Sequence, residues 1–197
     1  MNSKKAITLL VLATLLMSLL PTMSVSAALT PDEFTGDEVI YDDEIEVTGT
    51  GVTPGAALEL YWDFVQPWNG SAGKIAAGVG KPSGAFSVNL TVPASKGGHH
   101  YVWVKDVTTG AIEPAGYVQV NPTLVLSTEY GLPEDDIDVF GYGFNASEDV
   151  TVLDFGRGTF YTNKTSGLGD TDDYGSWDAS FEIPDWDYGV YDFNATV

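Results

Sequence analysis

The chain has 197 residues, of which 44% are hydrophobic, and its 28 acidic and eight basic residues give a formal net charge of −20. A charge this negative argues against nucleic acid as a partner, because phosphate backbones are repelled by it. Cysteine is absent, so disulfides are excluded and the folded state has to be held by packed cores.

The first 27 residues have the pattern of a secretory signal peptide. Two lysines near the start are followed by an apolar run over residues 6–20, and Val25-Ser26-Ala27 matches a small-residue cleavage site. The run is about fifteen residues long, which is shorter than the roughly twenty that cross a bilayer as a helix. We expect cleavage after Ala27, with an uncleaved membrane anchor as the alternative. Either reading places the rest of the chain outside the cell.

After the signal, the chain repeats itself at an offset of 91 to 92 residues. The matching segments are residues 45–52 with 137–144, 62–64 with 153–155, and 84–93 with 175–184. We therefore predict two consecutive units, residues 28–120 and 121–197.

Both units have the pattern of all-β sandwiches, because short runs rich in Val, Ile, Thr and aromatic residues alternate with turn residues. The predicted strands are residues 43–50, 56–65, 73–80, 84–92, 100–106 and 115–120, then 123–128, 136–143, 149–156, 158–164, 175–183 and 189–197. Alternation assigns to the core Phe86, Val88 and Leu90 in one unit and Trp177, Ala179 and Phe181 in the other. The same alternation points Asn89 outward.

Paired glycines interrupt the strand pattern at the same place in both units. Gly49 and Gly51 correspond to Gly141 and Gly143. Glycine inside a strand favours a bulge or a sharp bend, so we expect one at each pair.

Around the first pair, residues 45–55 read Ile-Glu-Val-Thr-Gly-Thr-Gly-Val-Thr-Pro-Gly. This segment resembles the V-x-V-x-G-x-G-F-x-P-G signature of immunoglobulin-like repeats of the IPT/TIG type, found in prokaryotic surface proteins. The second unit departs from it, with Asn145 and Ala146 in place of Pro and Gly. The resemblance, which covers residues 37–60 and 129–150, implies an immunoglobulin-like sandwich with an adhesive, spacer or surface-layer role. The family also decorates enzymes, so the resemblance does not decide function.

The second unit is predicted to lack its last strand, because the counterpart of residues 115–120 would fall beyond Val197. An open edge of this kind exposes unpaired backbone groups. Either further repeats of a longer protein follow, which we favour, or another subunit donates a strand and the chain self-assembles. Residues 29–40 would be the natural donor, but four acidic residues make that segment unusual for a buried strand.

Five of the seven asparagines lie in N-x-[ST] sequons, which predicts N-glycosylation of a secreted protein. Enrichment through turn chemistry is the alternative. The five are Asn69, Asn89, Asn145, Asn163 and Asn194.

The loop Asp170-Thr171-Asp172-Asp173-Tyr174-Gly175 is the candidate metal site, with calcium as the only cofactor considered. Asp170, Asp172 and Asp173 supply carboxylates, and the glycine stands at the sixth position as in calcium loops. Phe181 stands where such loops carry a glutamate, so a solvated acidic turn is the alternative. Adjacent His99 and His100 point to opposite faces of a strand and do not predict zinc.

The chain is not expected to be an enzyme. Asp63 and Asp154 are matched across the units, which suits a feature of the fold better than a catalytic group. Asp185 and Asp187 form the other carboxylate pair considered. Neither a nucleophile motif nor a phosphate-binding glycine loop is present.

Trp68 and Trp186 fall in predicted loops without aromatic partners in the other unit, which makes them the candidates for ligand binding. The sequence thus predicts a secreted, glycosylated structural or adhesive module of the cell surface, of surface-layer, spacer or adhesin type. Its partners would be other surface proteins or glycans. The alternatives are a glycan-binding or accessory domain of a larger secreted enzyme and a donor-strand filament subunit.

Overall fold

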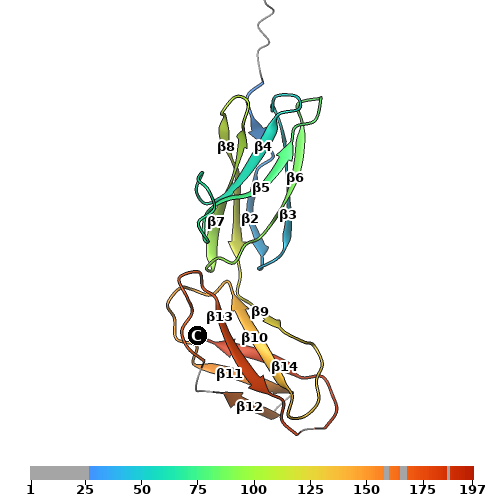
Figure 1. Ribbon diagram of the computed structural model, residues 1–197, viewed down its shortest axis with the longest axis vertical. Coiled ribbons are helices and arrows are strands. Elements are labelled where there is room, and N and C mark those ends of the chain that lie inside the picture. The colour runs from blue at the N-terminus through green and yellow to red at the C-terminus, as the bar shows by residue number, and fades with distance from the viewer. Residues whose placement is uncertain (1–26, 158–159, 165–167, 186) are drawn as a thin grey trace, which may run out of the picture.

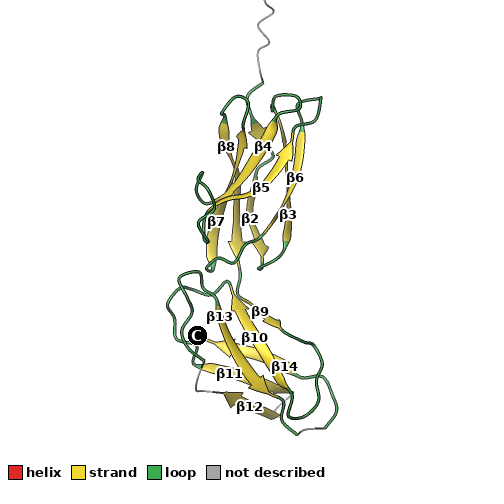
Figure 2. Ribbon diagram, in the orientation of Figure 1, coloured by secondary structure: helices red, strands yellow, loops and turns green. Residues whose placement is uncertain are grey.

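The structure, a computed structural model, describes residues 27–157, 160–164, 168–185 and 187–197. All regular structure in these ranges is strand and none is helix, which confirms the all-β prediction (Figure 2). Consequently no helix of the described chain is long and apolar enough to cross a membrane. The predicted signal peptide, apart from Ala27, lies outside the described residues.

The first eight strands, here called the N-terminal strand group, form two sheets with the orders β1-β3-β6 and β2-β8-β7-β4-β5 (Figure 1). Side chains from both sheets, among them Val47, Trp62 and Phe86, make one buried cluster, as expected where two sheets pack face to face. The strands are β1 (Thr30–Pro31), β2 (Phe34–Val39), β3 (Glu44–Thr50), β4 (Ala57–Trp62), β5 (Gly73–Val79), β6 (Phe86–Thr91), β7 (Gly98–Asp106) and β8 (Ile112–Val120).

The remaining six strands, the C-terminal strand group, form sheets with the orders β13-β10-β9 and β12-β11-β14. Their buried cluster is separate from the first and contains Val139, Leu153, Phe155 and Trp177. The strands are β9 (Thr123–Leu126), β10 (Asp136–Tyr142), β11 (Val152–Arg157), β12 (Phe160–Lys164), β13 (Trp177–Glu182) and β14 (Asp192–Thr196). All twelve predicted strands thus overlap observed ones, and the six predicted core residues are buried.

The two groups share a strand register. Gly49 lies opposite Phe86 where β3 pairs with β6, and Gly141 lies opposite Trp177 where β10 pairs with β13. A Cβ atom added to Gly141 would lie 2.1 Å from Nε1 of Trp177, and one added to Gly49 would lie 2.6 Å from Cε1 of Phe86. The predicted bulge at these glycines is therefore wrong, because pairing is unbroken and the missing side chain makes room for an aromatic ring.

The predicted bend falls at the second glycine of each pair, directly after the strand has ended. Gly51 and Gly143 have φ values of 82° and 76°, in the left-handed region that favours glycine. A Cβ atom on either would also overlap the backbone oxygen of Ala28 or Asn121. Each bend thus holds the chain that enters its strand group close to the end of β3 or of β10.

Sequence analysis missed β1 and β2, which lie in the segment considered as a donor strand. β1 pairs with β3, and β2 runs parallel to β8, so residues 29–40 already complete their own strand group. The four acidic side chains of the segment are exposed, which removes the objection to a strand there. This pairing argues against residues 29–40 as a donor to another molecule, and strand donation itself stays a prediction.

The two groups meet end to end through the short connection Asn121-Pro122 (Figure 1). The rings of Tyr41 and Tyr142 stack with centroids 3.9 Å apart, and burial there, aided by Tyr41, raises the pKa of Tyr142. The Gly97 amide donates a hydrogen bond of 2.9 Å to the Phe144 carbonyl oxygen. Side-chain stacking and a backbone hydrogen bond therefore both join the groups.

Candidate functional site

The loop between β4 and β5 is anchored by a partly buried polar network that joins Asp63 to the buried His100. Asp63 has a φ of 58°, its Oδ1 accepts from the Tyr101 amide at 3.0 Å, and its Oδ2 lies 2.8 Å from Nδ1 of His100. Nε2 of His100 lies 2.8 Å from the Lys96 carbonyl oxygen, and the imidazole stacks on Trp62. Each ring nitrogen of the buried His100 therefore lies within hydrogen-bond distance of an oxygen of the fold, and these contacts hold the loop in place.

The sequence match between Asp63 and Asp154 is not reproduced in the fold. Asp63 follows the end of β4, whereas Asp154 lies inside β11 opposite Asn163 and Asn194. The two carboxylates therefore lie in different surroundings. Asp185 and Asp187 are exposed on the loop before β14.

The β4–β5 loop presents apolar side chains to solvent. Trp68 is 40% exposed and Phe64 is 66% exposed. Asn69 shapes the turn beside them, because its Oδ1 accepts hydrogen bonds from the amides of Ser71 and Ala72. Trp186, the other predicted ligand-binding residue, lies outside the described residues. Trp68 is thus an exposed aromatic residue on a tethered loop, as a stacking surface for a sugar ring requires.

The acidic loop uses its carboxylates for turn formation. Oδ1 of Asp172 accepts hydrogen bonds of 2.8 Å from the amides of Tyr174 and Ser176. A hydrogen bond with the Asp149 carboxyl raises the pKa of Asp170, so this carboxyl faces Asp149. Across the described ranges, no group of three or more histidine or acidic side chains is placed to hold a metal ion. Calcium at Asp170, Asp172 and Asp173 stays a prediction.

The four sequon asparagines whose burial the structure describes, Asn69, Asn89, Asn145 and Asn194, are exposed, which places them where a glycan can be attached. Asn89 points outward from β6 as the alternation predicted. Asn194 lies on β14, and Asn163 lies on β12 at the position opposite Asp154. The amide nitrogen of Asn145 donates a hydrogen bond of 2.9 Å to Oε1 of Glu148. Occupancy of the sequons stays a prediction.

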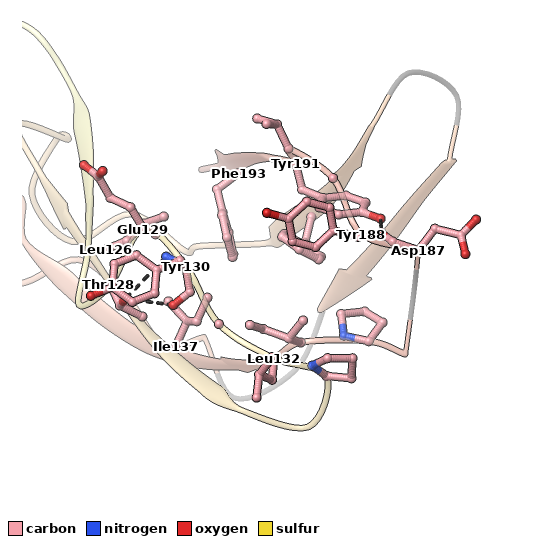
Figure 3. A pocket seen from close by; sticks show the side chains of 17 residues that line it. Leu126, Thr128, Glu129, Tyr130, Leu132, Ile137, Asp187, Tyr188, Tyr191 and Phe193 are labelled. Atoms are coloured by element: carbon pink, nitrogen blue, oxygen red, sulfur yellow. Dashed lines mark hydrogen bonds between the residues drawn. The ribbon is translucent and has the colours of Figure 1, made fainter.

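Sequence reasoning did not find an apolar groove of about 430 Å³ in the C-terminal strand group, which is lined by residues after β9 and by residues before and in β14 (Figure 3). One wall is the segment after β9, where Tyr130 and Leu132 are 86% and 72% exposed. The opposite wall carries Tyr188, Tyr191 and Phe193, which enter β14. Figure 3 shows the two walls facing each other across open space. The groove lies between the edge strands of the two sheets.

Charge is distributed unevenly over the two strand groups. Residues 28–120 contain twelve acidic and four basic residues, whereas residues 121–197 contain sixteen and two. In the N-terminal group, hydrogen bonds from Lys74 and Tyr61 lower the pKa of Glu59 to about 2, and Lys105 adds a contact at 3.6 Å. The C-terminal group, which contains the groove, is therefore the more strongly anionic part of the chain.

Comparisons with known proteins assign no family to the chain: no protein-family model matches it, and neither does any curated protein. Its function therefore has to be inferred from the residues and their arrangement.

Proposed function

We propose that the chain is a secreted, glycosylated module of the cell surface, made of two immunoglobulin-like sandwich domains at residues 28–120 and 121–197, with a structural or adhesive role. The signal pattern of residues 1–27 and the exposed sequons support secretion and glycosylation. The identical pairing of Gly49 with Phe86 and of Gly141 with Trp177 supports two copies of one sandwich.

The observation that carries a spacer or adhesive role is the close packing at the junction between the two groups. A Cβ atom on Gly97 would lie 2.5 Å from the Gly143 oxygen, and one on Gly175 would lie 3.0 Å from Cα of Lys96. Backbones that approach this closely leave little room for bending, because atoms at van der Waals contact resist further approach. A stiff pair of sandwiches suits a protein that holds a partner or its own neighbours at a fixed distance.

Glycan binding, as an independent module or as an accessory domain of a larger secreted enzyme, is the second candidate. The observation that favours it is the exposed loop that carries Phe64 and Trp68. Trp68→Ala should abolish retention on immobilised polysaccharide, whereas Val79→Ala, an exposed apolar change on β5, should leave it unchanged. Equal retention of both variants would reject this candidate.

We propose no catalytic role for the chain. The contacts of His100 support that proposal. His100 is buried, and both of its ring nitrogens have fixed partners in the fold, so the imidazole has no free nitrogen with which to reach a substrate.

The surface assignment is tested on intact cells that produce the chain. Brief treatment with an impermeant protease should remove an antibody signal against residues 28–197 while a cytoplasmic marker stays intact. Enzymatic deglycosylation should lower the mass of the wild-type protein more than that of an Asn89→Gln variant. A chain that keeps residues 1–27 and is protected until the cells are lysed would contradict the proposal.

A further inference from the structure

The side chain of Asn69 is fixed in the loop between β4 and β5. Its Oδ1 accepts hydrogen bonds from the amides of Ser71 and Ala72, at 3.0 and 2.9 Å, and from Oγ of Ser71 at 3.2 Å. The Asn69 amide donates in turn to the Ala72 carbonyl oxygen at 3.1 Å. Because Oδ1 and Nδ2 lie on opposite sides of one planar amide, Nδ2, the atom that carries an N-linked glycan, points away from this turn.

The loop is itself held on both sides of Asn69. The Lys74 amide donates a hydrogen bond of 2.8 Å to the Gln66 carbonyl oxygen, which closes the loop across its base. A Cβ atom on Gly73 would lie 2.5 Å from the Pro67 oxygen, so the two halves of the loop are in contact. A group attached to Nδ2 of Asn69 therefore starts from a fixed position.

Two exposed aromatic rings lie next to Asn69. Trp68, which precedes it, is 40% exposed, and Tyr174 of the C-terminal strand group is 37% exposed. A Cβ atom added to Gly70, the residue after Asn69, would lie 3.2 Å from Oη of Tyr174. The sequon therefore lies where the two strand groups approach each other, beside one ring from each group.

Tyr174 is held at this place by its own turn. Its amide donates a hydrogen bond of 2.8 Å to Oδ1 of Asp172. The carbonyl oxygen of the next residue, Gly175, accepts from the Phe144 amide at 3.1 Å, and a Cβ atom on Gly175 would lie 3.0 Å from Cα of Lys96. The turn that carries Tyr174 thus packs directly against the N-terminal strand group.

We propose that a glycan attached to Asn69 packs on Trp68 and Tyr174 and so holds the two strand groups together at their junction. Sugar rings have apolar faces that lie on aromatic rings while their hydroxyl groups stay in water. Attachment forms a bond between C1 of the first sugar and Nδ2 of Asn69, which loses a proton, and breaks the bond between C1 and the phosphate of an activated sugar donor. This arrangement, the glycan clasp, rests on the proposed secretion and glycosylation and deepens the proposed stiffness of the junction.

The chain's own glycan is the occupant because its attachment point lies next to the rings. A tethered group has a far higher effective concentration at a neighbouring surface than a free sugar has. Packing of the glycan also removes two aromatic rings from contact with water. An occupied Asn69 leaves Trp68 closed to an external glycan, which makes the glycan clasp an alternative to the second candidate function.

Asn89 provides a contrast within the same strand group. It lies on the outward face of β6, directly opposite Glu46, and Ser87 and Thr91 are the next residues along that face. A glycan on Asn89 starts among polar side chains. Its removal is therefore the control for the loss of a glycan as such.

The test uses the full chain, produced in cells with an N-glycosylation pathway, and matched pairs of variants. Ser71→Ala destroys the sequon of Asn69 but keeps the backbone donors to its Oδ1, whereas Ser71→Thr keeps the sequon. Thr91→Ala and Thr91→Ser are the corresponding pair at Asn89. Glycopeptide mass spectrometry measures the occupancy of each sequon, and hydroxyl-radical footprinting measures the oxidation of each aromatic ring.

We expect Asn69 to be occupied, and the oxidation of Trp68 and Tyr174 to rise severalfold in Ser71→Ala relative to Ser71→Thr. Thr91→Ala and Thr91→Ser should show equal oxidation of both rings. The unglycosylated wild-type chain separates the sugar from the Ser71 hydroxyl, because its two rings should be oxidised as strongly as those of Ser71→Ala.

The distance distribution between spin labels on the two strand groups measures the effect on the junction. It should be broader in Ser71→Ala than in Ser71→Thr, because only the latter carries the glycan. Tyr174→Ala removes the ring on the C-terminal side at an exposed position. Combined with Tyr174→Ala, the two Ser71 variants should have equally broad distributions, since the glycan then lacks a ring to pack on in the C-terminal strand group.

Several results would overturn the glycan clasp. An unoccupied Asn69 beside an occupied Asn89 would reject it and leave the surface proposal standing. An occupied Asn69 would also reject it if the rings of Trp68 and Tyr174 were oxidised equally in Ser71→Ala and Ser71→Thr, or if the distance distributions of that pair were the same. A chain without any occupied sequon would reject the clasp together with the proposed glycosylation, so the two failures are distinguishable.

Discussion

Replacement of Gly141 by alanine tests whether the glycine exists to make room for the opposite tryptophan. The new Cβ atom would lie 2.1 Å from Nε1 and 2.5 Å from Cε2 of Trp177, more than 1 Å inside ordinary contact. Trp177 is buried against Phe144, so the ring has little space into which to move. Overpacking of this kind costs about 1–3 kcal/mol, which exceeds the gain of about 0.5–1 kcal/mol that alanine normally brings to a strand.

The same reasoning predicts a different outcome at the equivalent glycine. Gly49→Ala meets not only the Phe86 ring but also backbone atoms of Thr30 and Pro31, each at 2.6 Å. Trimming the opposite aromatic residue should therefore rescue Gly141→Ala and fail to rescue Gly49→Ala. The coupling between Gly141→Ala and Trp177→Leu should reach about 1 kcal/mol or more, since the residues are in direct contact.

The assay is urea unfolding followed by far-ultraviolet circular dichroism, with a complete double-mutant cycle for each glycine. The variants are Gly141→Ala, Trp177→Leu and their combination, then Gly49→Ala, Phe86→Leu and their combination. A Gly141→Ala variant as stable as the wild type, or one whose cost is unchanged by Trp177→Leu, would refute the steric explanation.

Three further predictions concern single contacts. Asp106 is buried; burial alone would raise its pKa, but hydrogen bonds to backbone amides outweigh burial and lower the pKa. The charged form of Asp106 therefore stabilises the fold above the pKa of this group in the unfolded chain, and the contribution is lost as the pH falls through the folded-state pKa. Asp106→Asn should lower the free energy of unfolding by about 1–3 kcal/mol at pH 7, measured by urea unfolding, and by progressively less toward pH 2. Asp63→Ala should destabilise the fold by about 1–3 kcal/mol, because it leaves a buried nitrogen of His100 without a partner, and His100→Ala combined with it should add less than the two separate costs. Tyr142→Ala should leave each unfolding transition nearly in place but broaden the distance distribution between spin labels on the two strand groups, because it removes the stack with Tyr41.

The strands that alternate cleanly were predictable from the sequence. Phe86, Val88 and Leu90 alternate with polar neighbours, so one face of β6 had to be buried. β1 and β2 were missed because β1 is two residues long and β2 carries exposed acidic residues, so neither has a marked apolar face. Such strands are held by pairing with β3 and β8, which no local pattern reveals.

The match of Asp63 with Asp154 failed because the offset between the units changes along the chain. Trp62 pairs with Val102 and Phe155 pairs with Phe193, which makes Trp62 and Phe155 equivalent in the fold. The sequence alignment had placed Trp62 against Leu153, two residues away. Insertions in loops shift an alignment of short motifs without moving the strands themselves.

The groove in the C-terminal strand group was not predictable from the sequence. That residues 127–132 form the facing wall depends on where the chain runs after β9, and that path is fixed by contacts distant in sequence. The sequence alone does not show that Tyr130 and Leu132 are exposed and line a groove, because that depends on the fold.

Amide hydrogen exchange followed by mass spectrometry tests most directly the central claim, that the chain holds two copies of one sandwich in which β7 is paired on both sides and β14, among the described strands, is paired with β11 alone. The comparison is between residues 101–105 of β7 and residues 192–196 of β14, which are equivalent at the offset of 91. We predict strong protection of the former and much faster exchange in the latter, because β7 is paired on both sides and β14 on one. Equal protection of the two segments in the chain alone would contradict the claim.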